Sequence, residues 1–299
     1  MKFLLSLPFA ATRDPLGWAG ARAFTDWAVA AESAGFDAVA VTDHPFPTDE
    51  WLAGTGHHAF DPFVVLTAFA TVTQRIRLVT DILVAGYRNP YLLAKSIAST
   101  DIFSGGRLTV GIAAGYQRGE FDALGASYHD RGERFDEALE AATAALSGES
   151  VRRADGHYPA SGNTMLPRPI QQPRPPIWIG GNANAAIRRA VQLADGWMPF
   201  HQTKERVAIS GSPSLESLDE LASRIRTAQS SRAEQGKPPL DICTSIFEDQ
   251  REPEAAVARV PDYAEAGVTW IRVGLGGASL ESAIARIEAF GKARRAATG

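Results

Sequence analysis

Short apolar runs alternate with amphipathic stretches along the whole chain. Most of the apolar runs are hydrophobic throughout rather than at every second position, which is typical of parallel strands covered on both faces. Eight runs have the length of a buried strand: 3–7, 38–42, 77–83, 108–113, 177–179, 196–200, 241–247 and 269–273. The stretches between them show helical periodicity, as at 21–34, 90–103, 131–146, 183–193, 217–235, 254–266 and 279–295.

Eight strand–helix alternations within 299 residues predict an α/β fold, specifically a closed (β/α)8 TIM barrel. An open dinucleotide-binding sheet is disfavoured because no Gly-x-Gly-x-x-Gly motif follows the first strand. We expect one domain over residues 1–299, with residues 147–176 as an insertion before the fifth strand.

Two connecting segments are longer than ordinary loops. Residues 43–62 follow the second strand, and residues 147–176 precede the fifth. Long loops in compact domains are usually functional or disordered. The sequence therefore predicts that the first segment forms a wall of the active site and the second a flap over it.

Composition excludes several classes of partner. The net charge is −4 and the basic residues are scattered, so no nucleic-acid interface is expected. No apolar stretch approaches the roughly 20 residues that span a bilayer. The single cysteine, Cys243, lies in an apolar run and excludes an intrachain disulfide or a multi-cysteine metal site. We expect a cytoplasmic protein that acts on a small-molecule substrate.

The most informative segment runs from Pro175 to Trp197. It predicts a buried strand, a Gly180-Gly181 turn and a helix that opens at Asn182 or Ala183. Glycines between a strand end and a helix start expose backbone N–H groups, which together with the positive helix end can hold an anion. This pattern favours a phosphorylated ligand, although a tight turn without a ligand would show the same glycines.

Candidate chemistry lies at the ends of the second and third strands, where barrel enzymes place catalytic groups. His44 can transfer a proton near neutral pH, and Asp43 could fix its tautomer, or the pair could simply cap the strand. Asp81 interrupts an apolar strand, and a buried carboxylate needs partners. His57 and His58 are adjacent and fit no metal-binding spacing.

Small residues follow the fourth strand. The stretch 111–115 contains only glycine, alanine and isoleucine, and Tyr116 and Glu120 come after it. Small side chains at a barrel mouth leave room for a flat ring, though tight turns would also account for them.

In combination, these segments resemble the bacterial luciferase-like monooxygenase superfamily, in its coenzyme F420-dependent oxidoreductase branch. The matching motifs occur in the family's order: Ala34-Gly35-Phe36-Asp37, Thr42-Asp43-His44, Thr80-Asp81-Ile82-Leu83, Arg88-Asn89-Pro90, Ser104-Gly105-Gly106-Arg107, residues 111–115, Glu133-Arg134-Phe135-Asp136-Glu137 and residues 176–197. No single motif is decisive, but the ordered set is specific.

The resemblance implies a barrel that binds coenzyme F420, or alternatively FMN, at its C-terminal mouth. It implies a non-proline cis peptide between Asp81 and Ile82 against the ring, and proton transfer by His44, with Asp43 beside it. It implies cofactor contacts at Thr80, Asp81, Ile82, Ala114, Gly115, Tyr116, Gly180, Gly181, Asn182 and Ala183. A homodimer is a further expectation from the family.

One position departs from part of the family. Some F420-dependent sugar-phosphate dehydrogenases have a glutamate directly after the strand-four glycine, where this chain has Tyr116, and Glu120 follows four residues later. A sugar-phosphate substrate is therefore disfavoured. The leading hypothesis is hydride transfer between F420 and a small organic substrate, with an FMN-dependent monooxygenase as the alternative. A cofactor-free or metal-dependent hydrolase or lyase, and a non-catalytic flavin-binding protein, are weaker hypotheses.

Overall fold

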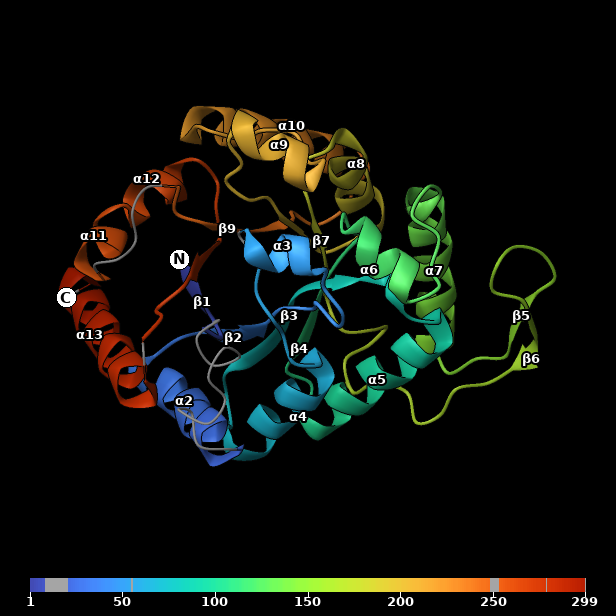
Figure 1. Ribbon diagram of the computed structural model, residues 1–299, viewed down its shortest axis with the longest axis horizontal. Helices are drawn as coiled ribbons and strands as arrows, with labels where there is room; N and C mark the ends of the chain where they lie inside the picture. Colours follow the sequence, from blue (N-terminus) through green and yellow to red (C-terminus); the bar gives the residue numbers. More distant parts are fainter. Residues whose placement is uncertain (9–20, 55, 248–252, 278, 299) are drawn as a thin grey trace.

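Eight parallel strands close into a barrel in the computed structural model, which describes residues 1–8, 21–54, 56–247, 253–277 and 279–298. The order around the barrel is β1-β10-β9-β8-β7-β4-β3-β2, with helices outside it (Figure 1). The strands are β1 (Lys2–Ser6), β2 (Ala38–Val41), β3 (Arg77–Val84), β4 (Leu108–Ala113), β7 (Ile177–Gly180), β8 (Gly196–Met198), β9 (Asp241–Ser245) and β10 (Trp270–Val273). The predicted (β/α)8 barrel is confirmed.

The outer helices follow the predicted ranges closely, except that the helix at Pro62–Val72 was not among the helical stretches predicted from the sequence. They are α2 (Ala21–Ala34), α4 (Pro62–Val72), α5 (Pro90–Phe103), α7 (Arg131–Leu146), α8 (Asn184–Leu193), α10 (Leu218–Glu234), α11 (Pro253–Ala258), α12 (Val260–Glu265) and α13 (Leu280–Thr298). The single helix expected over 254–266 is two helices, because Pro261 lies in the first turn of α12 and cannot continue a helix from its N-terminal side.

Short helices that the sequence pattern did not predict lie after the strands, on the side of the mouth. They are α3 (Asp49–Ala53), η1 (Ala85–Tyr87), α6 (Arg118–Ala123) and α9 (Lys204–Ser210). Each has at most seven residues, which is too short for hydrophobic periodicity to stand out.

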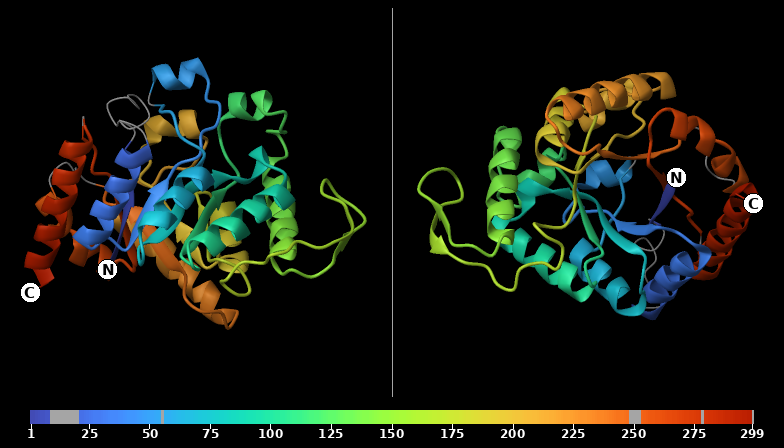
Figure 2. Two further views of the ribbon diagram at one scale, coloured as in Figure 1. Left: turned by 90° about the horizontal axis from the view of Figure 1, so that it is seen from below. Right: turned by 180° about the vertical axis from the view of Figure 1, so that it is seen from behind.

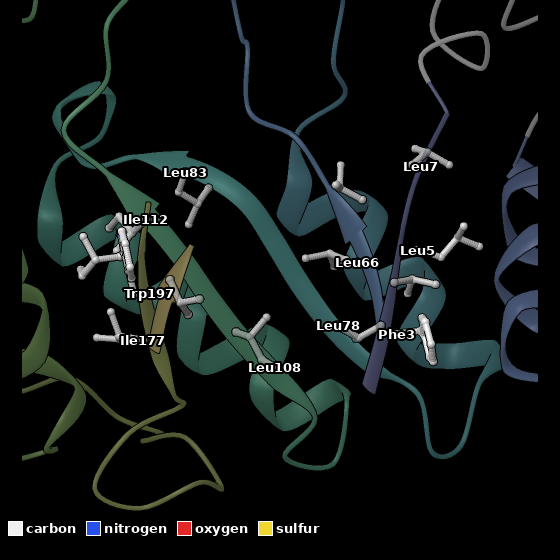
Figure 3. Close-up of a cluster of buried hydrophobic side chains, with 14 of the residues drawn as sticks. Phe3, Leu5, Leu7, Leu66, Leu78, Leu83, Leu108, Ile112, Ile177 and Trp197 are labelled. Atoms are coloured by element: carbon white, nitrogen blue, oxygen red, sulfur yellow. The ribbon is translucent and has the colours of Figure 1, made fainter. Parts of the chain in front are cut away.

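The core has two parts. A large cluster fills the space between sheet and helices and includes Phe3, Leu66 and Trp197 (Figure 3). A smaller cluster closes the barrel from within and includes Trp178 and Trp270, whose rings are in edge contact at 5.2 Å. Cys243 is part of this inner cluster, as expected of a core residue, and burial raises the pKa of its thiol.

The segment 147–176 is not a flap over the mouth. It forms an antiparallel hairpin of β5 (Val151–Arg153) and β6 (Ala160–Asn163) that projects from the side of the barrel (Figure 2). Farther along, Gln171 accepts a hydrogen bond from Arg77, the first residue of β3, and its amide donates to Asp101. The prediction was wrong because a connection from a helix to the next parallel strand runs along the N-terminal ends of the strands, opposite the mouth.

Candidate active site

A cavity of about 790 Å³ lies at the C-terminal ends of the strands. Residues that follow β2, β4, β7 and β8 line it, together with residues within β3, β9 and β10. Trp51 and His57 are among them, so the loop after β2 forms a wall of the cavity as predicted. None of residues 147–176 lines the cavity. This face of a parallel barrel is where barrel enzymes have their active sites.

The central polar contact joins His44, which follows β2, to Glu120 on α6. The imidazole Nδ1 lies 3.0 Å from Glu120 Oε2, and the glutamate is fully buried. The same carboxylate accepts hydrogen bonds from the Tyr87 hydroxyl at 2.9 Å and from the Phe46 backbone N–H at 3.1 Å. Because an ionised carboxylate can only accept hydrogen bonds, its contact with His44 favours the tautomer that carries the proton on Nδ1. The other ring nitrogen, Nε2, is then the basic one.

Glu120 was the functional residue that sequence reasoning left without a role. The sequence feature that could have identified Glu120 is its position four residues after Tyr116, on a segment just past β4. Its distance of 76 residues from His44 along the chain hides the contact, which only the closed barrel creates. Burial and the adjacent Glu120 raise the pKa of the Tyr87 hydroxyl, so Tyr87 stays a hydrogen-bond donor to this carboxylate.

Asp43 does not hold His44, which corrects the role suggested for it. Its two carboxylate oxygens accept hydrogen bonds from Arg88 at 2.6 and 2.9 Å, and the Val84 N–H donates to it at 3.2 Å. Asp43 and His44 are adjacent in sequence, so their side chains diverge at the strand end. Asp43 therefore joins the end of β2 to the segment after β3, and Glu120 orients His44.

Aromatic rings surround the imidazole. The rings of His44 and Trp51 are 4.4 Å apart, and His57 makes an edge contact with His44 at 5.0 Å. Tyr116 lies farther away, at 6.2 Å. Burial raises the pKa of the Tyr116 hydroxyl and Glu120 adds to the shift, although hydrogen bonds with Gln117 and Trp51 oppose it. The wall near His44 is therefore aromatic and largely screened from water.

The peptide bond between Asp81 and Ile82 is cis, as the family resemblance implied. Asp81 is buried inside the barrel, where Arg272 Nη1 lies 3.0 Å from Oδ1 and the Ser6 hydroxyl donates to Oδ2 at 3.2 Å. The buried carboxylate thus has the partners that its position in an apolar strand required. Both residues of the cis peptide line the cavity.

The Gly180-Gly181 turn opens into α8 at the edge of the cavity. Gly181 has φ +122°, a backbone conformation that favours glycine. The N-cap residue of α8, Ala183, offers no side-chain acceptor to the first N–H groups, so these groups can bind a ligand. Arg189 on α8 and Arg131 line the same cavity.

Eight of the ten expected cofactor contacts line the cavity: Asp81, Ile82, Ala114, Gly115, Tyr116, Gly180, Gly181 and Ala183. The other two have side chains engaged elsewhere. The Thr80 hydroxyl donates to the Gly111 carbonyl at 2.8 Å. The Asn182 amide donates to the Phe200 and Pro213 carbonyls, and its oxygen accepts from the Phe200 N–H. We therefore assign these two side chains a structural role.

Two further properties of the described residues bear on function. They contain no group of three or more His, Cys, Asp or Glu side chains placed to hold a metal ion. No helix in the described part of the chain combines the length and apolar character needed to cross a membrane.

The fold and the cavity define a class: a parallel (β/α)8 barrel with a histidine held by a buried glutamate and a glycine turn before a helix at its mouth. The chain belongs to the luciferase-like monooxygenase family, whose model matches residues 1–260. An uncharacterised protein of Mycobacterium tuberculosis is 30% identical over 241 residues, which is 74% of this chain and 78% of that protein.

Two solved structures have the same fold. Monooxygenase RslO1 from Streptomyces bottropensis aligns over the whole of both chains with a TM-score of 0.81 and 22% identity. An F420-dependent secondary alcohol dehydrogenase, in complex with an F420-acetone adduct, aligns over 99% of this chain and 100% of its own, with a TM-score of 0.75 and 16% identity. Membership of this family supports an enzyme, and the two solved structures show the shared fold.

Proposed function

We propose that the protein is an F420-dependent oxidoreductase that transfers hydride between the bound deazaflavin and a small organic substrate. The observation that carries the proposal is His44, which is oriented by a buried glutamate and faces the same cavity as the Asp81–Ile82 cis peptide. Interconversion of an alcohol and a carbonyl moves a proton together with the hydride, and a fixed imidazole meets that need.

The cavity fits a cofactor of this kind. Its volume of about 790 Å³ is within the usual range for small-molecule and cofactor sites. Two glycines of its lining pack closely against neighbouring side chains and have no room for a Cβ: one on Gly180 would lie 2.3 Å from Ile82 Cδ1, and one on Gly115 would lie 2.5 Å from Val84 Cγ1. Ile82 and Ala114 would contact the flat ring, and Tyr116 would contact the ring or its ribityl chain.

The phosphate of the cofactor would bind where α8 begins. The first N–H groups of α8 have no side-chain cap and lie at the positive end of this helix, where an anion is stabilised. Ala183 and Gly181 line the cavity there, although the Gly181 N–H itself donates to the Met198 carbonyl at 3.2 Å. Arg131 and Arg206 line the same cavity and add positive charge, whereas the charge of Arg189 is balanced by Asp136. Glycine at position 181 is needed because of its positive φ and because a Cβ would lie 3.3 Å from Ala186 Cβ.

The protein's own chemistry is proton handling. When bound, the deazaflavin would supply a two-electron hydride acceptor or donor. During oxidation of an alcohol, His44 Nε2 would accept the hydroxyl proton as the carbon loses hydride. The resulting imidazolium would keep its Nδ1–H bond to Glu120, whose negative charge stabilises it. In the reverse direction, the same Nε2 would donate the proton to the carbonyl oxygen.

Cofactor titration of the purified protein tests the proposal. We expect saturable binding of F420, followed by absorbance, and F420 reduction with a member of a panel of secondary alcohols. Binding of FMN without any binding of F420 would contradict the proposed cofactor. Binding of F420 with equal turnover by wild type and His44→Ala would contradict the proposed role of the imidazole.

An FMN-dependent monooxygenase is the second candidate, because RslO1 has the higher TM-score of the two aligned structures. Its signature is oxygen consumption that depends on reduced FMN from an external reductase and on an organic substrate. A metal-dependent hydrolase has no support among the described residues, where no suitable ligand cluster occurs.

A further inference from the structure

The floor of the cavity has a polar corner that the proposed proton chemistry does not use. Arg272 on β10 and Ser245 on β9 are directly opposite each other in the parallel register. Both side chains line the cavity, as does that of Asp81 on β3. Beneath them lies the apolar cluster that closes the barrel, with Trp178 and Trp270 in contact.

Arg272 is only partly engaged by protein. Its Nη1 lies 3.0 and 3.2 Å from the two carboxylate oxygens of Asp81. Among the residues that the structure describes, none accepts a hydrogen bond from Nε or Nη2, and the Ser245 hydroxyl is likewise without a partner. The Arg272 side chain is 29% exposed although it lies inside the barrel, so its open edge faces the cavity.

An open guanidinium edge at the bottom of a cavity limits what can occupy it. Water satisfies these donors while the cavity is hydrated. A ligand that displaces the water must supply acceptors, because buried polar groups without partners are costly. Asp81 neutralises Arg272 and fixes its orientation, so the charge is balanced while the donors stay available.

We propose that Arg272 and Ser245 form a subsite for a carboxylate or carbonyl group of the ligand that fills the floor of this cavity. Guanidinium Nε and Nη2 donate in parallel, which matches the two oxygens of a carboxylate, and the Ser245 hydroxyl adds a third donor. The subsite lies in the cavity of the proposed function and deepens it. Either the substrate or the carbonyl edge of the cofactor ring could supply the acceptor, and the experiment distinguishes these sources.

Benzoate is a suitable probe because it is a flat carboxylate of small volume. We would titrate it into cofactor-free protein by calorimetry, in phosphate buffer so that inorganic phosphate occupies the start of α8. The expected result is saturable binding that is weakened about tenfold or more in Arg272→Gln and less strongly in Ser245→Ala. Arg226→Gln, which removes the same charge from an exposed position on α10, should bind benzoate as the wild type does.

Arg272→Gln leaves Asp81 buried without its cation and could fail to fold. The double variant Asp81→Asn with Arg272→Gln removes both charges, and Ser245→Ala leaves the ion pair intact. Folding of each is checked by circular dichroism. Benzoate affinity within twofold of wild type in both the double variant and Ser245→Ala, together with unchanged F420 affinity, would overturn the proposal.

Repeating the titration with F420-loaded protein identifies the source of the acceptor. Unchanged benzoate affinity after loading assigns the subsite to the substrate. Loss of benzoate binding after loading, with F420 affinity that falls in Arg272→Gln, assigns it to the ring. Absence of benzoate binding in wild type, with F420 affinity that does not depend on Arg272, contradicts the subsite. The benzoate arm uses unloaded protein, so it remains informative if F420 does not bind at all.

Discussion

The two ends of the barrel use arginine in opposite ways. At the N-terminal end, Arg107 directs all three of its nitrogens to protein acceptors: Nε to the Ser104 carbonyl, Nη1 to Thr73 and Ile76, and Nη2 to Ala70 and Thr73. At the mouth, Arg272 bonds to Asp81 through one nitrogen and leaves an edge facing the cavity. An arginine whose donors are all satisfied by the protein holds segments together, whereas one with free donors is available to a ligand.

The same contrast holds for histidine. His157 pairs with Glu137 through Nδ1 at 2.6 Å beside α7, and His44 pairs with Glu120 through Nδ1 at 3.0 Å at the mouth. The pairs have the same chemistry, but only Glu120 is fully buried, and only His44 of these two histidines lines the cavity. Function therefore depends on where such a pair lies, and the predictions below test this difference.

The largest effect is expected from His44→Ala. Removal of a general acid–base should lower turnover by about 10²- to 10⁴-fold, while cofactor affinity changes by less than about threefold. Steady-state kinetics with F420 and an alcohol measure the first quantity, and a binding titration measures the second. His157→Ala removes the matched pair outside the cavity and should leave turnover within about twofold of wild type. An equal loss in both variants would show that the effect comes from stability.

Arg107→Met comes next and should act on stability alone. It leaves four buried or half-buried backbone carbonyls and the Thr73 hydroxyl without their donors. We expect a loss of about 3 kcal/mol in the free energy of unfolding, measured by urea denaturation. Arg226→Met, on the exposed face of α10, should cost less than about 0.5 kcal/mol. If the folded Arg107→Met protein binds F420 with altered affinity, the N-terminal end does not act on stability alone, and the comparison between the two ends is contradicted.

A smaller effect is expected from Gly181→Leu, which should weaken cofactor binding by about tenfold or more, or about 1.4 kcal/mol. The added side chain would fill the phosphate position and crowd Ala186. Gly236→Leu is the control, because Gly236 has φ +66° and no atom within 4 Å of an added Cβ. Both variants place a side chain at a positive φ, and the strain is larger at position 181, because φ +66° at Gly236 lies in the left-handed helical region. Folding of both is therefore checked by circular dichroism before their F420 affinities are compared. Equal affinities would argue against a phosphate at α8.

The sequence predicted the barrel well because each strand, and every outer helix except α4, shows a local hydrophobic pattern. The β4 and α5 bounds agree with the predicted ranges residue for residue. The partners inside the cavity could not be predicted, since His44 meets Glu120 across 76 residues and Asp81 meets Arg272 across 191. Such contacts follow from barrel closure, which sets strands β10 and β1 side by side, and one sequence does not encode the pairing in any local pattern.

The expected flap failed for a different reason. Its length correctly indicated a long connection, but its place between α7 and β7 determines which end of the barrel it can reach. In a parallel barrel, a connection from a helix to the next strand lies at the N-terminal ends of the strands. This places the segment where Gln171 contacts Asp101 and Arg77. Loop length predicts that a segment is unusual, whereas its position in the strand–helix order predicts on which face it lies.

Glu32 on α2 extends the comparison to carboxylates at the N-terminal end, with the smallest expected effect. Its side chain accepts the N–H groups of Gln74, Arg75 and Ile76 before β3. Burial raises the pKa of Glu32, but these hydrogen bonds and the charge of Arg75 outweigh it, and the net shift is downward. The folded state therefore binds the proton less readily than the unfolded state. The stabilisation is complete above the unfolded pKa and is lost as the pH falls through the lower, folded pKa.

We expect Glu32→Gln to lower the free energy of unfolding by about 1 kcal/mol at pH 7. The gap between variant and wild type should narrow as the pH falls below about 4, because the wild-type carboxylate then becomes protonated. Urea denaturation at a series of pH values measures this, with Glu149→Gln on the exposed surface as the control. Turnover should not change. If the difference in free energy of unfolding between the two proteins stays constant with pH, the shape of Glu32 and not its charge is stabilising. A change in turnover would show that the N-terminal end contributes to the chemistry at the mouth.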